Sequence, residues 1–298
     1  MTDTTDTYLG QILTDTRALV AKRKALVTTA ALEARSAFHA PTLSLARALR
    51  RPDGPAFIAE VKRASPSEGE LRREYDPAAI AQQYRVAAAA AVSVITEPAH
   101  FKGSLDHLAA VRQAVDLPLL RKDFVVDPYQ ITEARAYGAD AVLLIAAALD
   151  AAQLHDLLDA ADALGLGVLV EVHSASELAG LDLDRIAVLG VNSRDLRTFR
   201  VDLGQAETVF RELPERIVRV AESGIKTAEH TARLRAAGAD AFLVGSAFMR
   251  APDPGRALAA LRRETAVALA AGTRYEVQGA DSGSASAART PNPGPRTP

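Results

Sequence analysis

AFIAEVK, at residues 56–62, is the first of eight short apolar runs, and together these runs decide the fold. The other seven are AVSVIT at 91–96, LPLLRK at 117–122, AVLLIA at 141–146, LGVLVEV at 166–172, IAVLGVN at 186–192, IVRVAES at 217–223 and AFLVGS at 241–246. They recur at intervals of about 20 to 35 residues, the length of one strand–helix–strand step. Because the runs are continuously apolar rather than alternating, they predict strands buried on both faces.

Helix signals lie between the runs. Asp76-Pro77 and Asp127-Pro128 are typical of a helix N-terminus, and Gly138 and Gly238 stand where helices would end. Eight strands alternating with helices over about 220 residues predict an α/β fold, a (β/α)8 TIM barrel. The main alternative is a doubly wound open sheet, which would usually carry a Gly-rich phosphate loop. No G-x-G-x-x-G follows Val61, so the barrel is favoured.

Composition divides the 298 residues into three regions. Residues 1–50 carry Ile12, Leu19 and Leu26 at loosely helical intervals and predict an N-terminal helical extension, with the basic residues around Arg23 facing solvent. Residues 51–270 form the expected barrel. Residues 271–298 are rich in Gly, Ser and Pro, and they bury too little apolar surface to fold, so a disordered tail is expected.

Bulk properties limit the possible partners. Lys and Arg number 35 against 37 Asp and Glu, a net charge of −2, which argues against a nucleic-acid partner because phosphate-backbone binding needs a basic excess. No apolar stretch reaches about 20 residues, so no membrane partner is expected. The absence of cysteine excludes disulfides and thiolate zinc sites and fits a reducing cytoplasm. The six histidines lack zinc-binding spacing, so no metal site is expected.

Polar residues close seven of the eight runs, where a barrel enzyme places its active site. They are Glu60 and Lys62, Thr96 and Glu97, Arg121 to Asp123, Glu171, Asn192 to Arg194, Glu222 to Gly224, and Gly245 with Ser246. A charge that interrupts an apolar run is costly to bury unless it is paired. Any single one could belong to a structural ion pair, but seven together predict a functional site.

Four of these charges favour acid–base chemistry. Glu60 and Lys62 lie two residues apart, so both point to the same side of their strand. If that side is the lumen, they converge with Lys122 and Glu171 at the barrel mouth. Crowded opposite charges in a partly dry pocket shift pKa values. A lysine serves as a general acid if burial or another cation draws its pKa towards neutrality.

The last two runs predict a phosphate site. AESG at 221–224 and LVGS at 243–246 expose small residues with free backbone N–H groups. In barrels, the loops after strands seven and eight often bind phosphate. Either motif alone could be an ordinary tight turn, but the pair indicates a phosphorylated ligand.

Over residues 8–265 the chain resembles the indole-3-glycerol-phosphate synthases. The motifs that carry the resemblance are EVKRASPS at 60–67, SVITE at 93–97 with Phe101, LLRKDFVVDPYQI at 119–131, LVEVH at 169–173, GVNSRDL at 190–196, AESGI at 221–225 and FLVGSAFM at 242–249. The resemblance implies a lyase of tryptophan biosynthesis that uses no cofactor. It would convert 1-(2-carboxyphenylamino)-1-deoxyribulose 5-phosphate to indole-3-glycerol phosphate, carbon dioxide and water.

The resemblance also implies roles for six catalytic residues. Lys122 would be the general acid that protonates the ketone oxygen, and Glu171 a general base or a stabiliser of the cationic intermediate. Glu60 and Lys62 would hold the substrate carboxylate and assist dehydration. Asn192 would orient the substrate near Glu171. Ser223 completes the catalytic set.

Ten further residues would bind the substrate. Ser223 together with Gly224, Gly245 and Ser246 would hold the phosphate, with help from Arg194. Pro66, Phe101, Phe124 and Leu196 would form an apolar slot for the anthranilate ring. Ser65 and Glu222 complete the substrate-binding set. The chain departs from many relatives at Ala64 and Glu68, which stand where those relatives carry a basic residue.

Two other functions stay open at this point. Phosphoribosylanthranilate isomerase, another phosphate-binding barrel of amino-acid biosynthesis, needs a Cys and Asp pair, and this chain has no Cys. A non-catalytic sugar-phosphate binder would not need Lys122, Glu171 and Asn192 together. We therefore expect a cytoplasmic enzyme with a small sugar-phosphate substrate, either a monomer or a weak homodimer.

Overall fold

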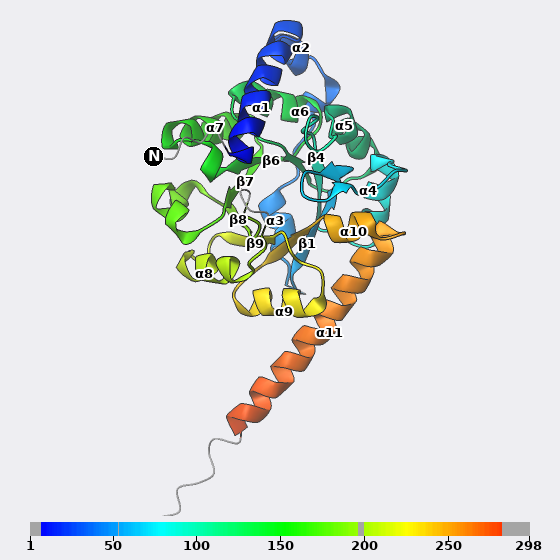
Figure 1. Ribbon diagram of the computed structural model, residues 1–298, viewed down its shortest axis with the longest axis vertical. Helices are drawn as coiled ribbons and strands as arrows, with labels where there is room; N and C mark the ends of the chain where they lie inside the picture. Colours follow the sequence, from blue (N-terminus) through cyan, green and yellow to red (C-terminus); the bar gives the residue numbers. More distant parts are fainter. Residues whose placement is uncertain (1–6, 53, 196–199, 282–298) are drawn as a thin grey trace, which may run out of the picture.

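The computed structural model describes residues 7–52, 54–195 and 200–281, and its centre is a closed barrel of parallel strands (Figure 1). Around the barrel the strands follow the order β1-β10-β9-β8-β7-β6-β5-β4. Their bounds are β1 Ala56–Val61, β4 Ala91–Ile95, β5 Leu119–Lys122, β6 Ala141–Ile145, β7 Gly167–Val172, β8 Val188–Asn192, β9 Val218–Glu222 and β10 Ala241–Val244. Each strand lies in one of the eight apolar runs, so the predicted (β/α)8 barrel is confirmed.

Helices surround the barrel, and most strands are followed by one. They are α4 Pro77–Val86, α5 Leu105–Ala114, α6 Pro128–Ala136, α7 Ala151–Ala163, α8 Gly204–Glu212, α9 Ala228–Ala236, α10 Ser246–Arg250 and α11 Pro254–Asp281. A short 3-10 helix, η3 Ala146–Ala148, precedes α7. The connection from β7 to β8 differs from the expected α-helix, because it folds as two 3-10 helices, η4 Ala175–Gly180 and η5 Leu183–Arg185.

The predicted helix signals act as expected. The side chain of Asp76 accepts a hydrogen bond from the Ala79 N–H, and that of Asp127 accepts one from the Tyr129 N–H, so both cap a helix that begins with proline. Gly138 and Gly238 follow α6 and α9 with φ of +85° and +105°. This left-handed backbone ends a helix at little cost when the residue is glycine.

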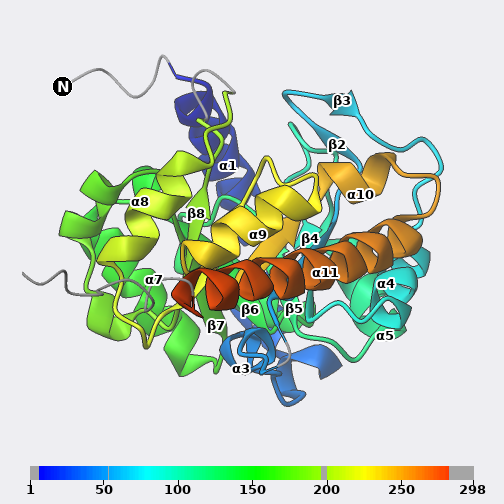
Figure 2. The ribbon, with the colours of Figure 1, turned by 90° about the horizontal axis from the view of Figure 1, so that it is seen from below.

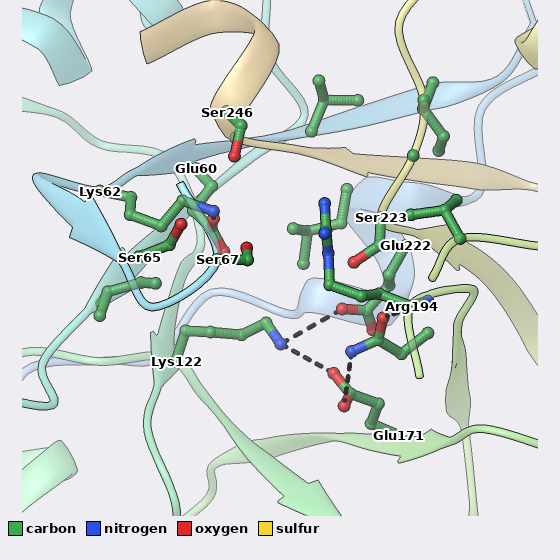
Figure 3. Close-up of a pocket in the computed structure, with 18 of the residues that line it drawn as sticks. Glu60, Lys62, Ser65, Ser67, Lys122, Glu171, Arg194, Glu222, Ser223 and Ser246 are labelled. Carbon is green, nitrogen blue, oxygen red and sulfur yellow. Dashed lines mark hydrogen bonds and ion pairs between the residues drawn. The ribbon is translucent and has the colours of Figure 1, made fainter. Parts of the chain in front are cut away.

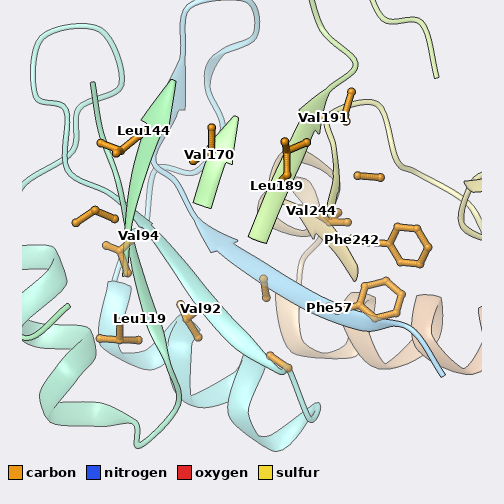
Figure 4. Close-up of a cluster of buried hydrophobic side chains, with 14 of the residues drawn as sticks. Phe57, Val92, Val94, Leu119, Leu144, Val170, Leu189, Val191, Phe242 and Val244 are labelled. Atoms are coloured by element: carbon orange, nitrogen blue, oxygen red, sulfur yellow. The ribbon is translucent and has the colours of Figure 1, made fainter. Parts of the chain in front are cut away.

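Strand residues alternate between two apolar clusters. Along β6, Val142 and Leu144 pack outward against the helices, whereas Leu143 and Ile145 point into the lumen. Figure 4 shows the outward cluster, which includes Phe57 of β1 and Phe242 of β10. Burial on both faces explains why the runs are continuously apolar. The same alternation decides which residues at the strand ends enter the lumen.

The N-terminal segment covers both ends of the barrel. Its elements are α1 Tyr8–Leu26, α2 Thr29–Glu33, η2 Ser36–His39 and α3 Leu45–Leu49. Figure 2 shows α1 on one side of the barrel and α3 on the opposite side. Leu45 and Leu49 are buried beside the starts of the strands, in a cluster with Ala56 and Ala141. The helical extension thus closes the barrel bottom with α3 and leaves α1 at the mouth.

Two details of this segment differ from the sequence prediction. Leu26 is 74% exposed, so the apolar face of α1 ends before it. Lys22 and Lys24 face solvent as predicted, but Arg23 is partly buried against Glu133 of α6, and Lys24 also pairs with Asp127. The loose helical spacing could not show that α1 docks against α6 through charged residues.

The C-terminal helix α11 packs against α4 and α9, as Figure 2 shows. Leu258, Leu261 and Thr265 are buried in this contact. The helix continues to Asp281 and so covers residues 271–281, where the composition predicts disorder. The rest of the predicted tail lies outside the described residues. No helix in the described part of the chain is long and apolar enough to cross a bilayer.

Candidate active site

A cavity of about 770 Å³ opens at the carboxyl ends of the strands. Its size suits a small molecule. Residues from β1, β5, β7, β8, β9 and β10 form its floor, and α1 forms part of its wall. Of the predicted site residues, all that the structure describes line this cavity: Glu60, Lys62, Ser65, Pro66, Phe101, Lys122, Phe124, Glu171, Asn192, Arg194, Glu222, Ser223, Gly224, Gly245 and Ser246. Leu196 lies outside the described residues.

The floor is an ion cluster around Lys122, shown in Figure 3. The Lys122 Nζ donates to Glu171 Oε2 at 2.8 Å and lies 3.3 Å from Glu222 Oε2. The Asn192 Nδ2 donates to Glu171 Oε1 at 3.1 Å. Glu171 and Glu222 are almost fully buried, whereas Lys122 keeps 15% of its side chain exposed to the cavity. The cluster joins four strands at one point that a bound molecule can reach.

The electrostatics of this inner cluster differ from the expectation for the lysine. Burial lowers the pKa of Lys122, but the carboxylates of Glu171, Glu222 and Glu60 outweigh burial, and its net pKa is raised well above its usual range. Lys122 is therefore an ammonium at neutral pH. Burial or a neighbouring cation could have drawn this pKa towards neutrality, but the surrounding carboxyl groups raise it instead.

The two carboxylates of the cluster differ in protonation. Burial raises the pKa of Glu171, but the charge of Lys122 and the hydrogen bonds from Lys122 and Asn192 outweigh it and lower the pKa to about 2. Burial and the charge of Glu171 raise the pKa of Glu222, and the charge of Lys122 lowers it. The two raising effects are larger, so the pKa of Glu222 is about 8. At neutral pH the site thus holds one ammonium, one carboxylate and one carboxylic acid. A group with a pKa near 8 suits proton transfer.

Two glycines make room for the buried carboxylates. A Cβ at Gly190 of β8 would lie 2.1 Å from Glu222 Oε1, and a Cβ at Gly245 would lie 2.3 Å from Glu60 Oε1. Gly190 occupies a lumen-facing position of β8, and Gly245 directly follows β10 at the mouth of the lumen. A side chain at either position would therefore push a carboxylate out of its place.

Glu60 and Lys62 form a second pair beside the inner cluster. The Lys62 Nζ lies 2.8 Å from Glu60 Oε1, and 13% of the Lys62 side chain is exposed. Both residues follow the alternation of β1 and line the cavity, which agrees with the prediction that they share one side. Together with Lys122 they place two cations in the cavity for an anionic ligand.

One wall of the cavity is apolar. The rings of Phe101 and Phe124 lie 6.2 Å apart between centroids, tilted by 40°. Leu9 and Ile12 from α1 complete this wall. The sequence prediction missed these two residues, because helical spacing marks them as apolar without showing what they pack against. The slot fits a flat aromatic ring.

Other charges at the strand ends have structural partners. The carboxylate of Glu97 accepts the backbone N–H groups of Ala99, His100 and Phe101 at 2.7 to 2.9 Å, and so shapes the loop that carries Phe101. Arg121 is fully buried and faces away from the lumen, where it pairs with Asp123 and Glu133. The polar ends of the strands thus divide between the site and the scaffold.

The rim at β9 and β10 fits the predicted phosphate site. Ser223 and Gly224 have φ of +64° and +75°. Left-handed backbone is strained for serine and is found at functional sites. A Cβ at Gly224 would meet the side chain of Val201 at 2.2 Å. Gly245 and Ser246 begin α10 on the same rim, and Arg194 lines the cavity with them.

Comparison with known proteins points to one family. Residues 9–261 match the family model described as indole-3-glycerol phosphate synthase. The chain is 53% identical over 258 residues to the indole-3-glycerol phosphate synthase of Salinibacter ruber, covering 86% of this chain and 95% of that protein. It is 48% identical over 255 residues to that of Mycobacterium ulcerans, covering 86% and 93%.

Solved structures with the same fold are more distant. Thiamine phosphate pyrophosphorylase from Pyrococcus furiosus superposes with a TM-score of 0.56 at 20% identity, over 76% of this chain and 100% of that one. The 3-hexulose-6-phosphate synthase from Salmonella typhimurium gives 0.56 at 15% identity, over 72% and 99%. At such identities the likeness shows the barrel fold alone. The family model and the relatives near 50% identity decide the family: the chain belongs to the indole-3-glycerol phosphate synthases.

Proposed function

We propose that this indole-3-glycerol phosphate synthase, a carboxy-lyase of tryptophan biosynthesis, acts through the inner cluster of Lys122, Glu171, Glu222 and Asn192. The substrate would be 1-(2-carboxyphenylamino)-1-deoxyribulose 5-phosphate. One observation carries the assignment: the Lys122 ammonium meets the carboxyl groups of Glu171 and Glu222 at the floor of a cavity with an apolar wall and a phosphate-type rim. A sugar phosphate joined to an aromatic acid would use all three surfaces: the rim for the phosphate, the wall for the aromatic ring and the charged floor for the reacting atoms.

The apolar wall and the rim would orient the substrate. The anthranilate ring would pack against the wall formed by Phe101, Phe124 and the α1 residues Leu9 and Ile12. The phosphate would bind at Ser223, Gly224, Gly245 and Ser246, with Arg194 close by. Lys62, held by Glu60 at 2.8 Å, offers its ammonium to the substrate carboxylate. The reacting ketone then lies over Lys122.

Ring closure is the first chemical step. The ring carbon that bears the carboxylate attacks the ketone carbon, and the ketone oxygen takes a proton from the Lys122 ammonium. The raised pKa of Lys122 does not prevent this transfer, because the developing alkoxide is a strong base. The positive charge left on the anilino system faces the Glu171 carboxylate, which Asn192 holds in place.

Decarboxylation and dehydration complete the indole. Loss of carbon dioxide breaks the bond to the ring and returns its electron pair to the aromatic system. The new hydroxyl would then leave as water with a proton from Glu222, whose pKa near 8 keeps it protonated at neutral pH. The adjacent CH2 group would give its proton to the Lys122 amine, which regains the proton that it donated in ring closure. Solvent reprotonates Glu222, because the ionised substrate carboxylate leaves as neutral carbon dioxide. The family resemblance alone implied only a substrate-binding role for Glu222.

The test is a fluorescence assay of indole-3-glycerol phosphate formation, with Glu171→Gln as the paired variant. We expect wild-type turnover and a loss of about 10²- to 10⁴-fold in kcat for Glu171→Gln. Substrate binding without turnover in the wild type would favour the non-catalytic sugar-phosphate binder instead. The cytoplasmic location and the monomeric or weakly dimeric state stay predictions.

A further inference from the structure

Glu68 places a carboxylate on the phosphate rim. It lies in the turn between β2 Ala64–Ser65 and β3 Gly69–Glu70, a short antiparallel hairpin that follows β1. From there its side chain reaches α10, where the Ser246 Oγ donates to Glu68 Oε2. The Arg250 Nη2 lies 3.4 Å from Glu68 Oε1. The Ser246 hydroxyl, which is expected to donate to the substrate phosphate, thus already donates to a carboxylate of the protein.

The surroundings of Glu68 favour negative charge. Burial raises its pKa, but the hydrogen bond from Ser246 and the charges of Arg250, Lys62 and Arg194 outweigh burial, so its net pKa is lowered. The carboxylate is therefore ionised at neutral pH. Because four donors and cations stabilise a carboxylate at this point, they would also stabilise a phosphate.

The two anions cannot share the site. A serine hydroxyl carries a single proton to donate, and two like charges on one donor repel each other. We propose that Glu68 is an affinity-determining residue, a tethered competitor that must leave Ser246 and Arg250 before the substrate phosphate binds there. This inference rests on the phosphate site of the proposed function.

The tip of the hairpin that carries Glu68 is exposed, whereas its first strand, β2, is buried. Ser67, Gly69 and Glu70 beside Glu68 are exposed. Gly69 has φ of +69° and nothing within 4 Å of a Cβ position. Glu68 contacts Ser246 and Arg250 of α10, and Arg72, just after the hairpin, donates to the carbonyls of Ala251 and Pro252. The phosphate therefore competes with the two contacts of Glu68, while Arg72 keeps the base of the hairpin in place.

The competition sets the expected effect of a substitution. When a site is free only part of the time, the apparent affinity of a ligand falls by that fraction. A partly exposed carboxylate held by one hydroxyl and one arginine would keep the site occupied most of the time. We expect Glu68→Gln to bind inorganic phosphate about fivefold more tightly, and to lower the KM for the substrate by more than it changes kcat.

Glu70→Gln is the matched control. Glu70 lies two residues away on the same hairpin and is also a carboxylate, but it pairs with Arg63 and Lys102 rather than with α10. The substitution removes the same charge from the same loop. We expect the affinity for inorganic phosphate to stay within twofold of the wild type, which excludes a general change in surface charge as the cause.

The experiment is calorimetric titration of inorganic phosphate into the wild type, Glu68→Gln, Glu70→Gln and Ser246→Ala. Weaker binding in Ser246→Ala with tighter binding in Glu68→Gln alone supports the proposal. Weaker binding in Ser246→Ala with unchanged or weaker binding in Glu68→Gln overturns the role of Glu68 and leaves the phosphate site standing. Unchanged binding in Ser246→Ala would move the phosphate site elsewhere, and the inference about Glu68 falls with it.

Discussion

Arg121 and Lys122 are neighbours on β5, yet they belong to two different buried charge clusters. Lys122 points into the lumen and joins the inner cluster with Glu171 and Glu222. Arg121 points outward and forms an outer cluster with Asp123 and Glu133. Strand alternation sends one cation to the cavity and the next to the interface with the helices. The same residue chemistry therefore lines a cavity on one face, where we propose that it acts in catalysis, and stabilises packing on the other.

The two clusters differ in how fully their hydrogen bonds are made. Arg121 donates to Thr96 Oγ1, the Gln130 carbonyl, Asp123 and Glu133, at 2.6 to 3.2 Å. In the inner cluster, Glu222 Oε1 is buried with no hydrogen-bond partner among the described residues. A buried polar atom without a partner is costly for stability. In the inner cluster this unpaired atom lies beside a cavity, where a bound substrate could supply the missing hydrogen bond.

The largest expected loss of stability is for Arg121→Met. Removing the guanidinium leaves two buried carboxylates without their main cation, which costs about 3–5 kcal/mol of unfolding free energy. Urea denaturation measures the loss. We expect kcat of the protein that remains folded to stay close to the wild type. A stability loss below about 1 kcal/mol would show that the outer cluster is not structural.

Gly190→Ala tests the inner cluster without removing a charge. The new methyl group would occupy the place of Glu222 Oε1 and displace that carboxyl from Lys122. A misplacement of this size in an active site costs about 10²-fold in kcat. Gly180→Ala is the control, because nothing lies within 4 Å of a Cβ there. Equal kcat values for the two variants would contradict the placement of Glu222.

The pKa of Glu222 predicts a pH dependence of stability. Its folded-state pKa is about 8 against an ordinary value of 4.5, so the native state holds a proton that the unfolded state releases. The stabilising contribution is complete below pH 4.5 and is lost as the pH rises towards 8. The unfolding free energy of the wild type should fall over this window more steeply than that of Glu222→Gln. Parallel curves for the two proteins would contradict the raised pKa.

The smallest effect is expected at the surface pair of Lys24 and Asp127. The two side chains lie 2.9 Å apart but are 50% and 30% exposed. Solvent screens such pairs, so Lys24→Ala should change the unfolding free energy by less than about 0.5 kcal/mol. This pair gives the scale against which the two buried clusters are compared. A loss above about 2 kcal/mol would mean that α1 depends on it for docking.

Much of the barrel could be predicted because its signals are local. Continuous apolar runs identify buried strands, and the Asp-Pro and Gly signals mark the helices between them. The helix signals could not show that the β7 to β8 connection folds as 3-10 helices, nor that α11 continues to Asp281. Both depend on how segments pack, not on composition alone.

Some features of the site could likewise be predicted from local sequence, and others depend on how distant segments pack. The pairing of Glu60 with Lys62 follows from their spacing on one strand. Spacing along the strand does not decide whether Arg121 or Lys122 faces the lumen, because this depends on the register of β5 in the closed barrel. The raised pKa of Glu222 depends on its burial and on the charge of Glu171, which arrives from another strand. Leu9 and Ile12 enter the site only because α1 docks over the mouth.

The central claim is that the inner cluster is catalytic, and the kcat of Lys122→Met tests it most directly. Met keeps the length of the side chain and removes its proton. We expect kcat to fall by about 10³-fold, while a phosphorylated product analogue still binds and the protein stays folded. A kcat close to that of the wild type, with the stability lost instead, would make Lys122 a structural cation like Arg121 and contradict the account.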